Sequence, residues 1–111
     1  MRKVINIRWE VTDIRNFKVI CDDFQCSDHI QDEHDGILEY EEEIKNAIMN
    51  PRNNIVFGDK FISSNHIYYQ KINEIFEIKV VAEFDDNSDG YILTAYLIKG
   101  RPKGEKILWT A

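Results

Sequence analysis

The stretch IFEIKVVAEFDDNSDGYILTAYLIK, residues 75–99, decides the fold of this chain. Two apolar runs rich in Ile, Val, Phe and Tyr flank the polar segment DDNSDG at 85–90. β-Branched and aromatic side chains favour strands, whereas clustered Asp, Asn, Ser and Gly favour tight turns. We therefore predict two antiparallel strands, at 75–84 and 91–99, joined by a turn.

Further strands are predicted on the N-terminal side of this hairpin. HIYYQKI (66–72) precedes it across Asn73-Glu74, a two-residue connection that suits a second tight turn. Shorter strands are predicted at 4–11, 17–21 and 54–57, where apolar side chains recur at short intervals. The three long strands, joined by short links, predict an antiparallel meander.

The best helix candidate is ILEYEEEIKNAIMN, residues 37–50, whose apolar side chains recur every three or four positions. Asn50-Pro51 ends this helix, because proline disfavours helical geometry in the residue before it. Residues 41–43, all Glu, are its solvated face. A second helical segment is predicted to start at an N-cap on Ser27 and to be interrupted at Gly36.

These elements predict an α+β fold made of one domain, residues 1–111. An N-terminal strand and helix portion packs on an antiparallel meander of three to five strands, with helix 37–50 on one face. A hydrophobic content of 43% in 111 residues is ordinary for a soluble domain. With neither a run of about 20 apolar residues nor a signal-peptide pattern, we expect a cytoplasmic protein without a membrane partner.

Charge is uneven along the chain. Residues 1–49 hold six Lys or Arg against twelve Asp or Glu, whereas residues 50–111 hold eight of each. The overall charge of -6 argues against a non-specific nucleic-acid binder, and we expect no DNA partner. A local basic site survives that objection.

Two cysteines, Cys21 and Cys26, lie five positions apart. This spacing is not the CxxC pattern of zinc sites, and there is no second pair. A single bridge is not a secreted disulfide framework either, so we expect two reduced thiols and no metal or other cofactor.

His29 and His34 are candidates for proton transfer, since histidine titrates near neutral pH. On a regular helix they would lie about 140° apart, which disfavours a shared metal. The alternative is that they are ordinary surface or capping histidines.

Thr94 and Tyr96 share one face of strand 91–99 with Ile92 and Ile98, because side chains alternate along a strand. The other face, made of Tyr91, Leu93, Ala95 and Leu97, is predicted to pack on the helix. Cations that can contact a phosphate follow this strand, namely Lys99, Arg101, Lys103 and Lys106. The alternative is a strand chosen for its β-propensity, followed by a solvated loop.

Read in order, HIQDEH, a helix ending in NP, IYYQKI, IKVVAEF, ILTAYLIK and KGEKILW resemble the phage-associated branch of the barnase–EndoU–colicin–RelE-like (BECR fold) nucleases. The resemblance covers residues 17–109. It implies a small ribonuclease that needs no metal, in which a ribose 2′-hydroxyl attacks the adjacent phosphate. His34 is followed by Asp35-Gly36 where the family pattern has Pro-Glu, which is a departure from it.

The resemblance also implies roles for particular residues. His34 would act as general base or acid with His29 as its partner, while Thr94 and Tyr96 would hydrogen-bond the scissile phosphate. Lys103 would offset charge on the phosphate oxygens. Arg101 would bind substrate, and Tyr68 or Tyr69 would stack an unpaired base.

Two functions follow from these observations. The first is a cytoplasmic endoribonuclease that cleaves RNA without a metal, either a toxin or a phage-derived processing enzyme. The second is a non-catalytic acidic protein that binds a basic protein partner, either an immunity or antitoxin-like protein or an inactive relative of the nucleases.

Overall fold

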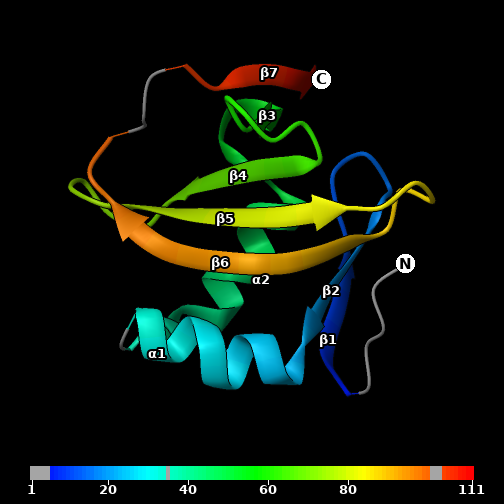
Figure 1. The fold of residues 1–111 in the computed structure, drawn as a ribbon. Coiled ribbons are helices and arrows are strands. Elements are labelled where there is room, and N and C mark those ends of the chain that lie inside the picture. The colour runs from blue at the N-terminus through cyan, green and yellow to red at the C-terminus, as the bar shows by residue number, and fades with distance from the viewer. Residues whose placement is uncertain (1–5, 35, 101–103) are drawn as a thin grey trace.

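The computed structural model describes residues 6–34, 36–100 and 104–111, and shows an α+β fold built on one mixed sheet (Figure 1). The seven strands of this sheet are ordered β1-β2-β6-β5-β4-β3-β7. The strands are β1 (Ile7–Thr12), β2 (Lys18–Asp22), β3 (Ile55–Gly58), β4 (Asn65–Lys71), β5 (Glu77–Phe84), β6 (Gly90–Ile98) and β7 (Lys106–Thr110). The helical segments are η1 (Gln25–Ile30), α1 (Gln31–Glu33), η2 (Ile37–Tyr40), α2 (Glu41–Met49) and η3 (Arg52–Asn54).

The predicted meander is confirmed in β4, β5 and β6, which pair antiparallel along most of their length. Asn73 shapes the first turn, because its side-chain oxygen accepts hydrogen bonds from the backbone amides of Ile75 and Phe76. Asp85 does the same in the second turn for Asn87 and Asp89. Both turns thus use the local side-chain bonds that make Asn and Asp common in turns.

The sheet has more strands than the predicted three to five, and it is mixed rather than antiparallel. β2 pairs with β6 in parallel, and β3 pairs antiparallel with both β4 and β7. β7 begins at Lys106, in the segment for which the sequence predicts a basic loop. Its short run KILWT carries only a weak alternating pattern, and its partner β3 lies some fifty residues earlier in the chain.

The helix predicted at 37–50 is confirmed, although its first turn, η2, is a 3₁₀-helix. Ile44, Ala47 and Ile48 of α2 are buried against the sheet, and Gly36 adopts the left-handed conformation just before η2. The N-cap predicted at Ser27 is wrong. Ser27 lies inside the π-helix η1, and its hydroxyl donates to Asp23. Among the described residues, no helix is long and apolar enough to cross a membrane.

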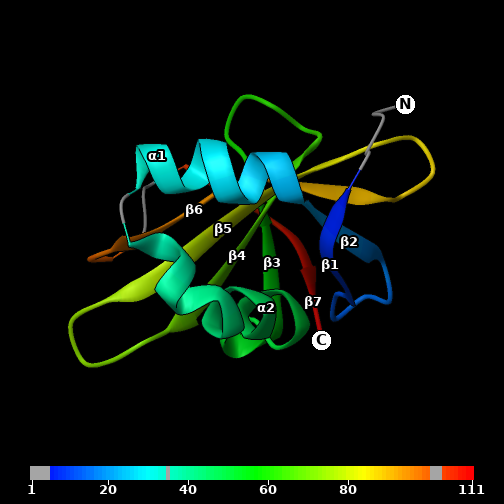
Figure 2. The same cartoon turned by 90° about the horizontal axis from the view of Figure 1, so that it is seen from below.

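Two helical layers flank the sheet differently. α2 lies across one face of the sheet, which we call the inner face (Figure 2). In contrast, η1 and α1 run alongside β6. The first turn of α2 is tied to β1, since Arg8 and the Trp9 indole both donate to the Glu41 carboxylate. The bond from Arg8 lowers the pKa of Glu41. Glu41 is therefore not part of a purely solvated acidic face, as predicted for residues 41–43.

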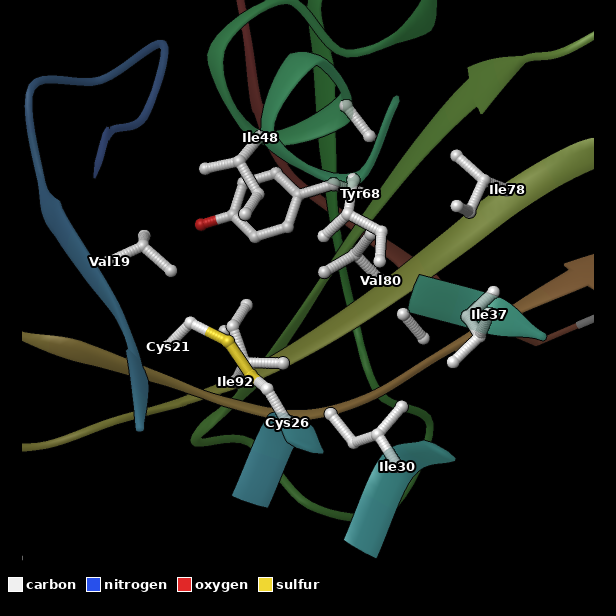
Figure 3. Close-up of a cluster of buried hydrophobic side chains, with 14 of the residues drawn as sticks. Val19, Cys21, Cys26, Ile30, Ile37, Ile48, Tyr68, Ile78, Val80 and Ile92 are labelled. Atoms are coloured by element: carbon white, nitrogen blue, oxygen red, sulfur yellow. A yellow bond between two sulfur atoms is a disulfide. The ribbon is translucent and has the colours of Figure 1, made fainter. Parts of the chain in front are cut away.

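The main core lies between the inner face and the helices (Figure 3). Val19, Tyr68, Val80 and Ile92 meet Ile30, Ile37 and Ile48 there. Within this core Cys21 and Cys26 form a disulfide that joins β2 to η1. The prediction of two reduced thiols is therefore wrong.

The predicted split of β6 into two faces needs one correction. A register shift opposite Val81 and Ala82 inserts a residue into β6. It turns Ile92 toward the inner face with Ala95, while Leu93 packs on the outer cluster of Phe57, Ile67, Tyr69 and Val81. Beyond the bulge, Thr94 and Tyr96 do share the outer face, as predicted, opposite Val81 and Lys79.

Asp13 ties the β1–β2 hairpin to the centre of the sheet. Its carboxylate accepts the backbone amides of Arg15 and Phe17 at 2.8 and 3.0 Å. It also accepts the Arg15 guanidinium at 2.7 Å and the Tyr68 hydroxyl at 2.8 Å. The Asp13 side chain is 0% exposed and that of Arg15 is 7% exposed. Asp13 and Arg15 therefore form a buried ion pair in which both charged groups have hydrogen-bond partners.

We expect Asp13→Ala to lower the free energy of unfolding by about 3 kcal/mol, because the Arg15 charge would stay buried without a counter-charge. Tyr68→Phe leaves the ion pair intact but removes the hydrogen bond donated to Asp13 and the one accepted from Arg15 at 3.2 Å, and should cost about 1 to 2 kcal/mol. Urea unfolding of both variants measures the difference. A smaller loss in Asp13→Ala than in Tyr68→Phe would show that the ion pair does not hold the hairpin.

His66 is the histidine whose environment is most altered. Its ring stacks on Phe84 at a centroid distance of 4.3 Å, and burial lowers its pKa from 6.5 to about 4. Its Nδ1 is buried and has no hydrogen-bond partner among the described residues. Folded protein therefore keeps His66 neutral at pH values where the unfolded chain already binds a proton.

Stability should consequently depend on pH through His66. Its effect is absent above pH 6.5, and the free energy of unfolding should fall as the pH drops from about 6.5 toward about 4. His66→Phe keeps a ring for the stack and removes the titrating group, so this part of the slope should disappear. Denaturant unfolding of both proteins across this range, compared as a difference, separates His66 from the carboxylates. Parallel curves would contradict the assignment.

Candidate functional site

A pocket of about 470 Å³ lies where the second half of β6 meets the turn between α1 and η2. Its size is within the range of small-molecule and substrate clefts. The residues that line it are His34, Gly36, Ile37, Glu39, Tyr40, Tyr96 and Leu97. We call it the His34–Tyr96 pocket.

The His34 and Tyr96 rings stack in this pocket, with centroids 4.9 Å apart and planes inclined by 24°. Sequence reasoning selected both residues, and the fold brings them together across sixty positions of chain. The path of η1 and α1 along β6 causes this contact. The Gln25 side chain donates to the Leu93 carbonyl at 2.7 Å, and the His34 amide donates to the Ile30 carbonyl at 2.9 Å where α1 ends.

His29 lies near this pair but points to solvent. Its side chain is 52% exposed and pairs with Glu33 one helical turn further on. The other carboxylate oxygen of Glu33 lies 3.9 Å from Nε2 of His34. The two histidines therefore share one carboxylate, which is a way to orient an imidazole rather than to bind a metal.

Thr94 lies one strand repeat before Tyr96 on the outer face, opposite Val81. Its hydroxyl oxygen is buried and makes no hydrogen bond to any described residue. Buried hydroxyls usually have a partner, so this unsatisfied hydroxyl is an exception, although Thr94 is not among the residues that line the His34–Tyr96 pocket. The structure therefore places Thr94 on the same face as Tyr96 but does not bring its hydroxyl into the pocket.

Tyr68 and Tyr69 do not fit the predicted role in base stacking. Tyr68 is fully buried on the inner face, where its hydroxyl donates to Asp13. Tyr69 is buried on the outer face, where Phe57 packs edge-on at 5.6 Å and Glu105 accepts its hydroxyl. Because each ring is covered by protein, neither offers a free face to a base.

Lys79 and Glu105 were missed by the sequence reasoning. The Lys79 ammonium lies 3.0 Å from the Glu105 carboxylate, and these side chains are 9% and 8% exposed. The same ammonium lies 5.7 Å from the centre of the Tyr96 ring. The sequence signal that could have revealed this pair is Lys79 itself, the one lysine in the largely apolar run IFEIKVVAEF. If that strand is buried, the lysine charge needs a partner of opposite charge.

The described charges around the pocket are mainly acidic. Glu39 lines it, and Glu33 lies beside His34. The predicted cations Arg101 and Lys103 lie outside the described residues. Within the part of the chain that the structure describes, no group of three His, Cys, Asp or Glu side chains is placed to hold a metal ion. The groups at the site, an imidazole and two hydroxyls, can transfer protons and form hydrogen bonds.

Comparison of the chain with protein-family models, with curated proteins and with solved structures found no match. The site is therefore interpreted from its own geometry.

We expect Glu105→Gln to lower the free energy of unfolding by about 3 kcal/mol, because Lys79 would be left buried without its counter-charge. The double variant Lys79→Met/Glu105→Gln removes both charges and should recover most of that loss. Urea unfolding of the two variants provides the test. If the double variant is as unstable as the single one, the loss does not come from an unpaired charge.

Proposed function

We propose that this protein is an endoribonuclease that cleaves RNA without a metal, with the His34–Tyr96 pocket as its active site. In this proposal the α+β fold is of the RelE/barnase-like type, and the protein is a toxin or a phage-derived processing enzyme. A cytoplasmic location belongs to the same proposal. The Cys21–Cys26 disulfide counts against that location, because structural disulfides are rare in reducing compartments.

The observation that carries the proposal is the stacked contact of His34 and Tyr96. An imidazole is the usual proton-transfer group at neutral pH, and a phenol can donate a proton or a hydrogen bond. In this structure the two rings come from the end of α1 and from β6, and both face one pocket. Neither His34 nor Tyr96 belongs to the buried cluster that forms the main core, so neither ring is needed to fill that core.

The proposed reaction uses these groups directly. His34 takes the proton of a ribose 2′-hydroxyl, and the 2′ oxygen forms a bond to the adjacent phosphorus. The bond from phosphorus to the 5′ oxygen breaks, and Tyr96 supplies the proton that this leaving oxygen needs. Thr94 donates a hydrogen bond to a non-bridging phosphate oxygen. The products are a 2′,3′-cyclic phosphate and a 5′-hydroxyl.

Glu33 has a positioning role in this scheme. Its carboxylate lies between His29 and His34 and is within ion-pair distance of both imidazoles. After the first proton transfer, His34 carries a positive charge, which Glu33 is placed to stabilise. His29 is then the neighbour that holds Glu33 in place rather than a group that contacts the phosphate.

A non-catalytic interaction protein is the second candidate. It is favoured by the described charges at the pocket, Glu33 and Glu39, because they suit a basic ligand better than a phosphate. In that case a basic protein would occupy the pocket and no RNA would be cleaved.

The direct test is cleavage of single-stranded RNA by the purified protein in EDTA. We expect 2′,3′-cyclic phosphate ends, at least a hundred-fold loss in His34→Ala, and a ten-fold or larger loss in Tyr96→Phe, which keeps the ring but removes the hydroxyl. Glu42→Gln changes an exposed charge on α2, outside both pockets, and should cleave like the parent protein.

Intact RNA at high protein concentration, across several sequences, would refute the ribonuclease and favour the interaction protein. Cleavage that persists in His34→Ala would refute this active site while leaving a ribonuclease elsewhere on the protein. A thermal melt of each variant shows whether a loss of activity is a loss of fold.

A further inference from the structure

A second pocket, of about 310 Å³, lies at the tip of the β4–β5 hairpin, and we call it the hairpin pocket. Its lining residues are Arg52, Lys71, Asn73, Glu74, Ile75, Phe76, Glu77 and Gly100. They come from η3, from the hairpin and from the segment that follows β6. None of these positions belongs to the His34–Tyr96 pocket.

The hairpin pocket combines cations with an aromatic ring. The Lys99 ammonium lies 5.6 Å from the centre of the Phe76 ring, and Lys99 itself is exposed. Lys71 pairs with Glu74 at 3.6 Å, but both side chains are more than half exposed, so that pair is weak. Arg52 forms an ion pair with Glu77, which holds its side chain at the side of the pocket. Lys71 and Lys99 are therefore the cations that can turn to a ligand.

The sheet register places the hairpin pocket next to the candidate active site. On the outer face, Tyr69, Lys79 and Tyr96 lie in one row across β4, β5 and β6. The next row toward the hairpin tip is Lys71, Glu77 and Ile98. Adjacent rows on one face are about 7 Å apart, since a strand rises about 3.3 Å per residue. A nucleic-acid chain bound at Tyr96 therefore needs to extend only about 7 Å along the outer face to reach the row that borders the hairpin pocket.

We propose that the hairpin pocket binds a flanking nucleotide of the same single-stranded RNA that the His34–Tyr96 pocket cleaves. This inference rests on the proposed function. The base stacks on Phe76, and Lys71 and Lys99 contact its phosphate.

The contacts explain why the ligand is single-stranded nucleic acid. A base can stack on an aromatic side chain only when it is free of its helix, and stacking combined with cations is the general mode of single-strand binding. A base placed on Phe76 displaces the Lys99 ammonium from the ring, and the neighbouring phosphate offers that ammonium a stronger partner. The Asn73 side chain fixes the Phe76 backbone beforehand, because its oxygen accepts a hydrogen bond from the Phe76 amide at 2.9 Å.

The test measures binding separately from cleavage. A fluorescent 2′-O-methyl RNA oligonucleotide cannot undergo attack by its 2′ oxygen, so its dissociation constant is measurable by anisotropy over a series of salt concentrations. Lys99→Gln should weaken binding several-fold and lower the slope of log K against log salt by about 0.7. Phe76→Leu should weaken binding about five-fold or more and leave the slope unchanged.

Lys18→Gln is the matched control, because it removes one exposed lysine charge from β2, which meets β6 at its opposite end. It should bind like the parent protein. Lys99 is exposed, so Lys99→Gln should fold normally, and a thermal melt verifies this for Phe76→Leu as well.

The outcomes separate the inference from the function on which it rests. RNA cleavage by the parent protein, with unchanged oligonucleotide affinity in both variants, overturns the hairpin pocket and leaves the ribonuclease standing. Oligonucleotide binding that both variants weaken, without cleavage of natural RNA, supports the pocket and overturns the catalytic proposal. No binding of the oligonucleotide by the parent protein overturns the pocket.

Discussion

The short parallel pairing of β2 with β6 is the constraint from which the candidate site follows. The two strands meet only at Val19–Gly90 and Ile20–Tyr91, so β2 does not accompany the rest of β6. η1 and α1 run along that part of β6 instead (Figure 1), and the Gln25 side chain donates a hydrogen bond to the Leu93 carbonyl. His34 reaches Tyr96 because a helix, rather than another strand, lies there.

Buried charge holds this arrangement from two sides. On the inner face, Asp13 joins the β1–β2 hairpin to Tyr68 and thereby keeps β2 against the core. On the outer face, the Lys79–Glu105 pair fastens Glu105, the residue before β7, to β5, and the Lys79 ammonium lies 5.7 Å from the Tyr96 ring. Buried pairs of this kind are sensitive to loss of one partner, so each fixes a position more than it adds stability.

Local sequence patterns predicted the parts of the fold that depend on neighbouring residues. The 3.6-residue period of α2 and the turn residues Asn73 and Asp85 were enough for the helix and the meander, and alternation along β6 placed Thr94 with Tyr96. Features set by tertiary contacts could not be predicted from local patterns: β7 needs β3, which lies far away in the chain, and the bulge in β6 turned Ile92 and Leu93. The Cys21–Cys26 disulfide spans only five positions, but it needs η1 to approach β2. Tyr68 and Tyr69 failed as base-stacking residues because alternation predicts opposite faces but not that both faces are covered.

The most direct measurement of the central claim is an NMR titration of the histidine ring signals with a 2′-O-methyl RNA oligonucleotide. The imidazole resonances of His34 should shift on binding, because an RNA phosphate then lies beside that ring. The resonances of His66, which is buried against Phe84, should stay where they are. Saturation of the protein with RNA while the His34 signals do not move would contradict the account.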